Sequence, residues 1–173
     1  MTLAAAATIA LPPDARSFRE ALGRFATGVT FITAAPDGEP AGLIVNSLTS
    51  VSLEPPLLAF CPSRRSFTWS RMRRTRRFGV NVLGRQHKRF VARAIPADAD
   101  RFAGLDWEPG HSGVPLLTDA LASFECELVA EHPAGDHSIV VGRVNNLRVR
   151  PVKEPLIFFA GAFRGLPQKS AGS

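Results

Sequence analysis

Cysteine is scarce in this sequence, and the two cysteines, Cys61 and Cys126, lie far apart without forming a CxxC pair. This excludes a disulfide framework and a cysteine-based zinc site. We interpret both as buried strand cysteines that behave as small hydrophobic residues. Their low number predicts a protein of the reducing cytoplasm.

Long hydrophobic runs are also missing. No apolar stretch approaches the roughly 20 residues that a membrane-spanning helix needs, so we expect no membrane association. The alanine-rich start has no positive charge before its apolar run, which is followed by Pro12-Pro13. We therefore interpret residues 1–16 as a mobile tail rather than an export signal.

Several catalytic signatures do not occur. The sequence has no GxGxxG after a strand, no P-loop, no GxSxG and no HExxH. This disfavours a Rossmann dinucleotide site, a hydrolase and a metalloenzyme. The histidines are too widely spaced to predict a metal cluster: His87, His111, His132 and His137. We predict no metal site.

Positive charge is in excess. The 173 residues carry a net charge of +6, and the basic residues concentrate between Arg64 and Arg93. Nucleic acid is attracted to such a patch, but dinucleotides and flavin phosphates are anions too, so charge alone does not choose between them. We interpret Arg71–Arg77 mainly as a solvated surface. The length suits one domain, predicted at 17–166, with a second tail at 167–173.

Hydrophobic periodicity predicts short elements at close spacing. Phe18, Ala21, Leu22 and Phe25 indicate an amphipathic helix over 17–27 with Ser17 as N-cap. A Pro36-Asp37-Gly38 turn joins strands 29–35 and 41–46. Further strands are expected at 57–61, 78–83, 121–131, 137–150 and 156–159, with a helix at 86–95 and a loop at 96–118. Without βαβ alternation, this order favours an antiparallel sheet or barrel.

Small polar side chains follow the strand that ends near Val45. They are Asn46, Ser47, Thr49, Ser50 and Ser52. A solvent-facing strand would explain any one of them, but their concentration favours a ligand-binding strand. Asparagine offers both the donor and the acceptor that the pyrimidine edge of a flavin requires, and hydroxyl groups adapt to either role.

The Ser63-Arg64-Arg65-Ser66 cluster opens a predicted helix. A serine N-cap is expected here in any case. Helix N-terminal amides also bind anions, with a dipole contribution of roughly 0.3–1 kcal/mol, and arginine adds charge-assisted hydrogen bonds of about 1.5–3 kcal/mol each. The cluster therefore predicts a phosphate site. Gly135-Asp136-His137, taken alone, predicts only a hairpin turn.

Taken together, these segments resemble the flavin reductase family of short single-domain proteins that supply reduced flavin to two-component monooxygenases. The matching segments, in order, are FREALGRFATGVTFITA, NSLTSVSLEPPLLAFC, SRRSFTW, RFGVNVL, AGDHSIVVGRV and PLIFFAGAFRGL. They cover almost the whole chain, from about residue 18 to residue 166. Each motif is modest alone, but their order and spacing are specific.

The resemblance implies a mainly β fold, an FMN-binding split β-barrel that is antiparallel and Greek-key-like, with a few flanking helices. It implies a homodimer, and hydride transfer from NADH or NADPH to FMN or FAD. The reduced flavin would pass to a partner flavin-dependent monooxygenase, with no role for nucleic acid or a membrane.

The same resemblance implies roles for individual residues. The flavin ring and ribityl chain would contact Asn46, Ser47, Thr49 and Ser50, and the phosphate would contact Ser63, Arg64 and Ser66. Leu48, Cys61 and Phe67 would complete the cofactor site, and His137 would lie near the nicotinamide. Two features depart from the family pattern: phenylalanine replaces a common tyrosine within 158–163, and Arg65 replaces a smaller residue.

Two other functions stay open at this point. A flavin carrier that does not turn over NAD(P)H would show the same binding motifs. A nucleic-acid-binding protein could use the basic segment, although that segment lacks the interleaved aromatic residues of a single-strand platform.

Overall fold

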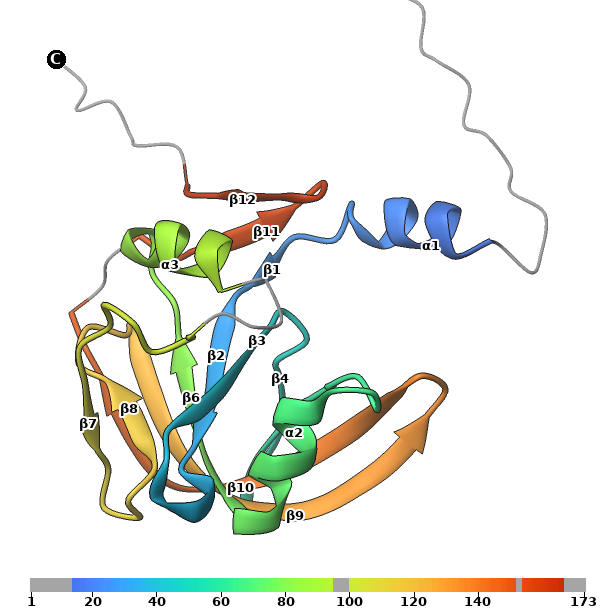
Figure 1. The fold of residues 1–173 in the computed structure, drawn as a ribbon. Coiled ribbons are helices and arrows are strands. Elements are labelled where there is room, and N and C mark those ends of the chain that lie inside the picture. Colours follow the sequence, from blue (N-terminus) through green and yellow to red (C-terminus); the bar gives the residue numbers. More distant parts are fainter. Residues whose placement is uncertain (1–13, 95–99, 152–153, 167–173) are drawn as a thin grey trace, which may run out of the picture.

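The computed structural model describes residues 14–94, 100–151 and 154–166. Its largest unit is an antiparallel sheet of seven strands, in the spatial order β3-β2-β6-β9-β10-β5-β4 (Figure 1). The strands are β2 (Thr30–Ala34), β3 (Ala41–Val45), β4 (Thr49–Leu53), β5 (Pro56–Phe60), β6 (Arg77–Val82), β9 (Ala122–Ala134) and β10 (His137–Val149).

Two smaller sheets flank this one. Strands β1, β11 and β12 form a three-stranded sheet, and β7 pairs with β8. The remaining elements are β1 (Thr27–Gly28), β7 (Trp107–Pro109), β8 (Pro115–Leu117), β11 (Ile157–Phe159), β12 (Ala162–Arg164), α1 (Ala15–Leu22), α2 (Phe67–Met72) and α3 (Lys88–Arg93), with 3-10 turns at Pro36–Gly38, Arg73–Thr75 and Arg85–His87. The predicted class, mainly antiparallel β with a few flanking helices, is confirmed.

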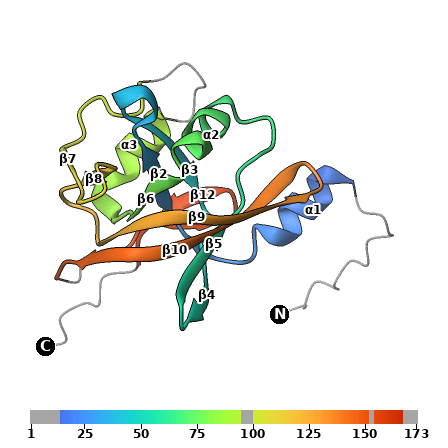
Figure 2. The ribbon, with the colours of Figure 1, turned by 90° about the horizontal axis from the view of Figure 1, so that it is seen from below.

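The two edge strands of the large sheet are consecutive in the chain. Strands β3 and β4 lie at opposite edges, yet only residues 46–48 join them. Such a link reaches about 15 Å at most, so the sheet must curl until its edges approach one another at this end, where β3 leads into β4 (Figure 1). Figure 2 shows β3 and β4 on opposite sides of the β9–β10 hairpin. The prediction of one continuous polar strand over 46–52 is therefore wrong: the chain leaves β3 at Asn46 and begins β4 at Thr49.

The longest element is the hairpin of β9 and β10. Its strands pair from Ala134–His137 to Ala122–Val149, with two register shifts, and its tip extends beyond the body of the sheet (Figure 1). The two long strands are confirmed, but their connection is shorter than the predicted 132–136. Gly135 takes the positive φ of 63° that this tight turn needs.

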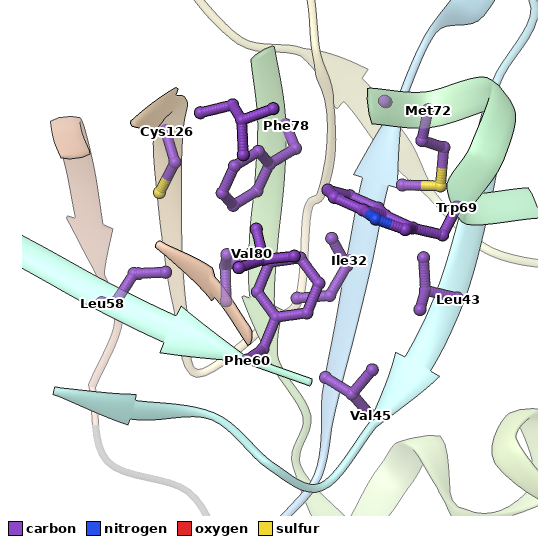
Figure 3. Close-up of a cluster of buried hydrophobic side chains, with 13 residues drawn as sticks. Ile32, Leu43, Val45, Leu58, Phe60, Trp69, Met72, Phe78, Val80 and Cys126 are labelled. Atoms are coloured by element: carbon purple, nitrogen blue, oxygen red, sulfur yellow. The ribbon is translucent and has the colours of Figure 1, made fainter. Parts of the chain in front are cut away.

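Hydrophobic side chains fill both faces of β2, whose five residues are all buried. On one face, Ile32 belongs to a cluster in which the rings of Phe60 and Trp69 lie 5.2 Å apart (Figure 3). On the other face, the ring of Phe31 packs against the ring of Phe90 of α3, with the two ring centroids 5.1 Å apart. Successive strand residues point to opposite faces, so β2 holds the two clusters together.

A buried asparagine joins four strands. Asn81 of β6 donates to Phe31 O and Thr33 Oγ1 of β2, and its Oδ1 accepts from the Leu117 N–H and the Ser123 hydroxyl. A buried amide needs hydrogen-bond partners for both its nitrogen and its oxygen, because each unpaired polar group costs about 1–3 kcal/mol. The network fixes β2, β6, β8 and β9 relative to one another.

Helix α1 differs from the prediction at both ends. Its N-cap is Asp14 rather than Ser17, because the Asp14 carboxylate accepts the N–H groups of Arg16 (2.8 Å) and Ser17 (2.9 Å). The helix ends at Leu22, and Thr27, predicted to be helical, pairs with β11. The helix therefore begins inside the predicted tail 1–16; the rest of that tail and the C-terminal tail 167–173 lie outside the described residues.

Besides β1, three short strands were not predicted. Strands β7 and β8 lie within the predicted loop 96–118, and β12 follows β11 through a two-residue turn at Ala160-Gly161. Each has only three residues, too few for an alternating pattern to emerge. The predicted helix 86–95 is divided between a 3-10 turn and α3, with Ile95 outside the described residues. No helix within the described ranges is long and apolar enough to cross a membrane.

Both cysteines are free. Cys126 is buried on β9, and this burial raises the pKa of its thiol to about 12, with the neighbouring Glu125 contributing. The thiol is therefore neutral and belongs to the core, as predicted. For Cys61 the prediction of a buried strand cysteine is wrong: the residue lies just after the end of β5 and is only half-buried, because the chain leaves the sheet there and Cys61 lines the pocket described below.

The carboxylate of Glu125 fastens the β7–β8 loop to β9. Glu125 is 4 % exposed, and it accepts the N–H groups of His111 (3.0 Å) and Ser112 (2.7 Å) together with the Ser112 hydroxyl. Burial on its own would raise the pKa of Glu125, but the hydrogen bonds from Ser112 and His111 outweigh it. The pKa of Glu125 therefore lies below its ordinary value of 4.5.

We expect Glu125→Gln to lower the free energy of unfolding by about 1–3 kcal/mol at neutral pH, because its amide nitrogen cannot accept the loop N–H groups. Since the folded-state pKa is lowered, the carboxylate stabilises the fold above its unfolded-state pKa. That contribution is lost as the pH falls through the folded-state pKa. Urea unfolding of Glu125→Gln and the wild type at neutral pH measures the deficit, and the same comparison at a pH below the folded-state pKa measures its loss, with the exposed neighbour Glu127→Gln as control. An equal deficit at both pH values would contradict the assignment.

Candidate functional site

A pocket of about 590 Å³ opens where the end of β3, the segment after β5, α3 and the start of β10 meet. This volume lies within the about 300–1,000 Å³ that is typical of small-molecule sites. Its polar lining consists of Asn46, Ser47, Cys61, Ser63, Ser66, Arg101 and His137, and its apolar lining of Leu43, Ile44, Val45, Pro62, Val91, Ala94 and Phe163. The lining is therefore suited to a ligand with both apolar and polar parts.

Asn46 and Ser47 reach the pocket because the chain leaves the sheet there. The Ser47 Oγ accepts the N–H of Cys61 at 2.9 Å, which ties the link after β3 to the end of β5. The Ser47 hydroxyl keeps its own hydrogen to donate, and the exposed Asn46 amide offers both a donor and an acceptor. These are the groups that a heterocycle with alternating carbonyl and N–H positions requires.

The segment after β5 is shaped by its own serines. Ser63 Oγ accepts the Arg65 N–H (3.2 Å), and Ser66 Oγ accepts the Trp69 N–H (3.1 Å). Ser66 is thereby the N-cap of α2, which is anchored by the buried Trp69. Each hydroxyl keeps its hydrogen for another acceptor, such as a phosphate oxygen.

The same segment pairs with the start of β10. Ser63 and His137 form an isolated antiparallel bridge, in which the Ser138 N–H donates to Pro62 O and the Arg64 N–H donates to Asp136 O, each at 3.0 Å. The serine-arginine motif and the Gly135-Asp136-His137 turn are distant in sequence, and this pairing makes them one structural unit.

His137 is oriented by its neighbour. Its Nδ1 lies 2.8 Å from Asp136 Oδ1. This hydrogen bond and the charge of His137 hold the pKa of Asp136 below its usual range, with Arg19 of α1 contributing further. An ionised Asp136 can only accept, so Nδ1 carries the hydrogen of this bond, and Nε2 is the ring nitrogen left for a ligand.

Six of the eleven predicted site residues line the pocket: Asn46, Ser47, Cys61, Ser63, Ser66 and His137. The other five, Leu48, Thr49, Ser50, Arg64 and Phe67, do not line it. Thr49 and Ser50 lie on β4, Phe67 is 77 % exposed, and the Arg64 Nη1 donates to Gly135 O at 3.2 Å. The roles predicted for all eleven stay predictions.

Several pocket residues were not predicted. Phe163 comes from β12, Val91 and Ala94 from α3 and its C-cap, and Arg101 from the segment before β7. The Arg101 Nη1 donates to Gly42 O (2.9 Å) and Thr68 Oγ1 (3.0 Å), and its Nε donates to Ala94 O (3.3 Å). No local sequence pattern signals this residue, because its partners are remote in the chain.

The pocket offers binding groups rather than a catalytic acid–base pair. Among the residues that the structure describes, no carboxylate lines it. Within the described residues, no group of three or more His, Cys, Asp or Glu side chains is placed to hold a metal ion. The arrangement suits chemistry that the bound molecules themselves carry, with the protein supplying orientation and electrostatics.

Known proteins resemble this chain along almost its full length. Residues 22–167 match the family described as "Flavin reductase like domain". The reductase subunit HsaB of a flavin-dependent monooxygenase from Rhodococcus jostii is 42% identical over 158 residues, which is 91% of this chain and 81% of that protein. The FMN reductase (NADH) SmoA from Agrobacterium fabrum is 42% identical over 87% of this chain and 85% of its own.

The fold is likewise shared with solved structures. The NADH:FAD oxidoreductase SgcE6 of Streptomyces globisporus C-1027, solved in complex with NAD and FAD fragments, superposes with a TM-score of 0.86. The match covers 93% of this chain and 98% of that one, at 34% sequence identity. Architecture and sequence therefore agree over almost the whole chain.

Proposed function

This chain belongs to the flavin reductase-like family, and from this premise we propose that it is an NAD(P)H-dependent flavin reductase. It takes hydride from NADH or NADPH, passes it to FMN or FAD, and supplies the reduced flavin to a partner flavin-dependent monooxygenase. The names of its relatives, a monooxygenase reductase subunit and an NADH-dependent FMN reductase, support this reaction and this partner.

One observation carries the proposal: a single pocket brings together the Asn46-Ser47 link, the Ser63 and Ser66 hydroxyls and the Asp136-oriented His137. The residues present fit a flavin. Apolar side chains such as Ile44 and Phe163 suit the dimethylbenzene end of the ring, the Asn46 and Ser47 side chains suit its pyrimidine edge, and two hydroxyl donors suit a phosphate.

When bound, the flavin and the nicotinamide supply the redox chemistry, which needs little covalent help from the protein. Asn46 and Ser47 would donate to the flavin edge on which negative charge develops. Ser47 is already held in place by its bond to the Cys61 N–H. His137, with Nε2 as acceptor, would orient the carboxamide N–H of the nicotinamide. The Asp136 carboxylate would keep the ring in that tautomer.

We also propose a homodimer in the cytoplasm. No residue of α1 is buried. Phe18 and Leu22 of α1 and Phe25 just after it are 53%, 56% and 73% exposed, so this segment presents apolar surface that a second copy would cover. The two free cysteines suit a reducing compartment. Sedimentation as a single species of 18.6 kDa would exclude the dimer.

The reaction is tested by following NADH and NADPH oxidation at 340 nm with FMN or FAD added. We expect a rate that requires flavin with at least one of the two donors. Flavin binding by fluorescence quenching without any flavin-dependent rate would favour a carrier instead. Salt-sensitive binding to DNA or RNA, with no flavin binding, would favour the nucleic-acid function.

We expect His137→Ala to raise the KM for NADH or to lower the hydride-transfer rate by about 10-fold or more, while flavin still binds, because the nicotinamide loses its orientation. Stopped-flow reduction of the flavin separates these effects. His132→Ala, on the same hairpin but outside the pocket lining, is the matched control. Kinetics of His137→Ala that match this control would remove His137 from the site.

A further inference from the structure

The segment from residue 64 to residue 77 is exceptionally rich in positive charge. Seven of its 14 residues are arginine and none is acidic. It contains α2 and the 3-10 turn that follows this helix. We call four of these arginines, at the end of α2 and just after it, the arginine surface: Arg71, Arg73, Arg74 and Arg76.

Ion pairs neutralise little of this charge. In the described part of the chain, the arginine surface makes one ion pair, between Arg73 Nη1 and Glu131 Oε2 at 3.2 Å. Arg76 donates instead to a neutral backbone carbonyl of β9, at 3.0 Å. Within the same residues, the side chains of Arg71 and Arg74 form neither a hydrogen bond nor an ion pair. The surface therefore keeps a net positive charge.

Adjoining hollows connect this surface with the pocket. Ser66 lines both the pocket and a hollow of about 250 Å³, whose lining includes Arg73. Arg73 also lines a hollow of about 340 Å³ together with Arg74 and Arg76, and Arg74 shares a third, of about 270 Å³, with Arg71. Because neighbouring hollows share residues, they lead from the arginines to the side of the pocket where Ser66 lies.

Arg71 and Arg74 act on the pocket only through space. They line neither the pocket nor the hollow beside Ser66, so they do not contact a molecule seated in the pocket. The six residues of α2 span about 9 Å, and the Debye length at physiological ionic strength is about 8 Å. The field of the two cations therefore extends over the Ser66 side of the pocket. Asp37, which shares their hollow, offsets one of the two charges.

We propose that the arginine surface attracts phosphate-bearing cofactors from solution and guides them to the pocket. A positive surface beside a binding site raises the association rate of an anionic ligand by about 10- to 1,000-fold. The inference rests on the proposed function: an enzyme that passes its reduced flavin to another protein must capture a new molecule in every turnover. Flavin and nicotinamide nucleotides both carry phosphate, so the test includes both.

The test measures the association and dissociation of FMN by stopped-flow fluorescence in Arg71→Gln/Arg74→Gln. At an ionic strength of about 0.01 M, we expect the association rate constant to fall about 3- to 10-fold with the dissociation rate constant unchanged, because the field acts on the approaching anion. The difference should vanish at about 1 M, where the Debye length is about 3 Å. Riboflavin, which lacks the phosphate, should associate equally fast with the variant and the wild type, which also verifies that the pocket is intact.

Arg143→Gln/Arg150→Gln is the matched control, because it removes the same charge elsewhere. Both arginines are exposed, on β10 and just after its end. At about 3.3 Å per residue, Arg143 lies about 20 Å along the strand from His137 and Arg150 lies farther away. We expect this variant to associate with FMN as fast as the wild type does.

Three results would overturn the proposal. An equal loss in both double variants would show that net charge, and not its position, sets the rate. Faster FMN dissociation with unchanged association would show that the arginines hold the bound phosphate. Loss of salt-sensitive DNA binding in Arg71→Gln/Arg74→Gln, with every cofactor constant unchanged, would assign the surface to nucleic acid.

The second cofactor and the proposed function have separate readouts. Unchanged FMN constants with a lowered kcat/KM for NADH at low salt, but not for dihydronicotinamide riboside, would support the capture of phosphate and assign it to the donor. A wild-type protein that binds neither flavin would contradict the proposed function itself.

Discussion

The three-residue link between β3 and β4 is the constraint on which the rest of the structure depends. These strands lie at opposite edges of the seven-stranded sheet, and so short a link is possible only if the sheet curls. The curl brings Asn46 and Ser47 to the end of β5, where Ser47 accepts the Cys61 N–H. Strand β5 pairs with β10, with Phe60 opposite Val140, so the segment after β5 runs beside His137. The pocket is a consequence of this path.

Rigid surroundings hold the pocket in shape. Two hydrophobic clusters pack on opposite faces of β2, and the Asn81 network connects its neighbours by hydrogen bonds. The pocket itself is built from strand ends and short connections, where side chains are not needed for core packing. This arrangement suits an enzyme whose cofactors carry the reaction, because the protein must hold two large molecules in one orientation rather than supply a nucleophile.

The sequence predicted the parts of this structure that leave local patterns. Alternating and β-branched residues located six of the seven strands of the large sheet, all but β4, and Pro36-Asp37-Gly38 and Gly135-Asp136 marked two of their turns. Boundaries were missed where tertiary contacts decide them: Asp14 caps α1 ahead of the predicted Ser17, and Asn46 leaves the sheet because β4 belongs to the far edge. Arg101 escaped prediction since its partners, Gly42 and Thr68, are 59 and 33 residues away. Conversely, Arg64 stood out in the sequence as a phosphate ligand, but its side chain donates a hydrogen bond to Gly135 O at the tip of the hairpin.

The central claim is that one molecule of flavin occupies the pocket between the Asn46-Ser47 link, Ser63, Ser66 and His137. A crystal structure of the protein with FMN tests it most directly. We expect the flavin ring to lie against Asn46 and Ser47, with its open face toward His137. Flavin bound instead along the exposed Arg71–Arg77 surface, with the pocket empty, would contradict it.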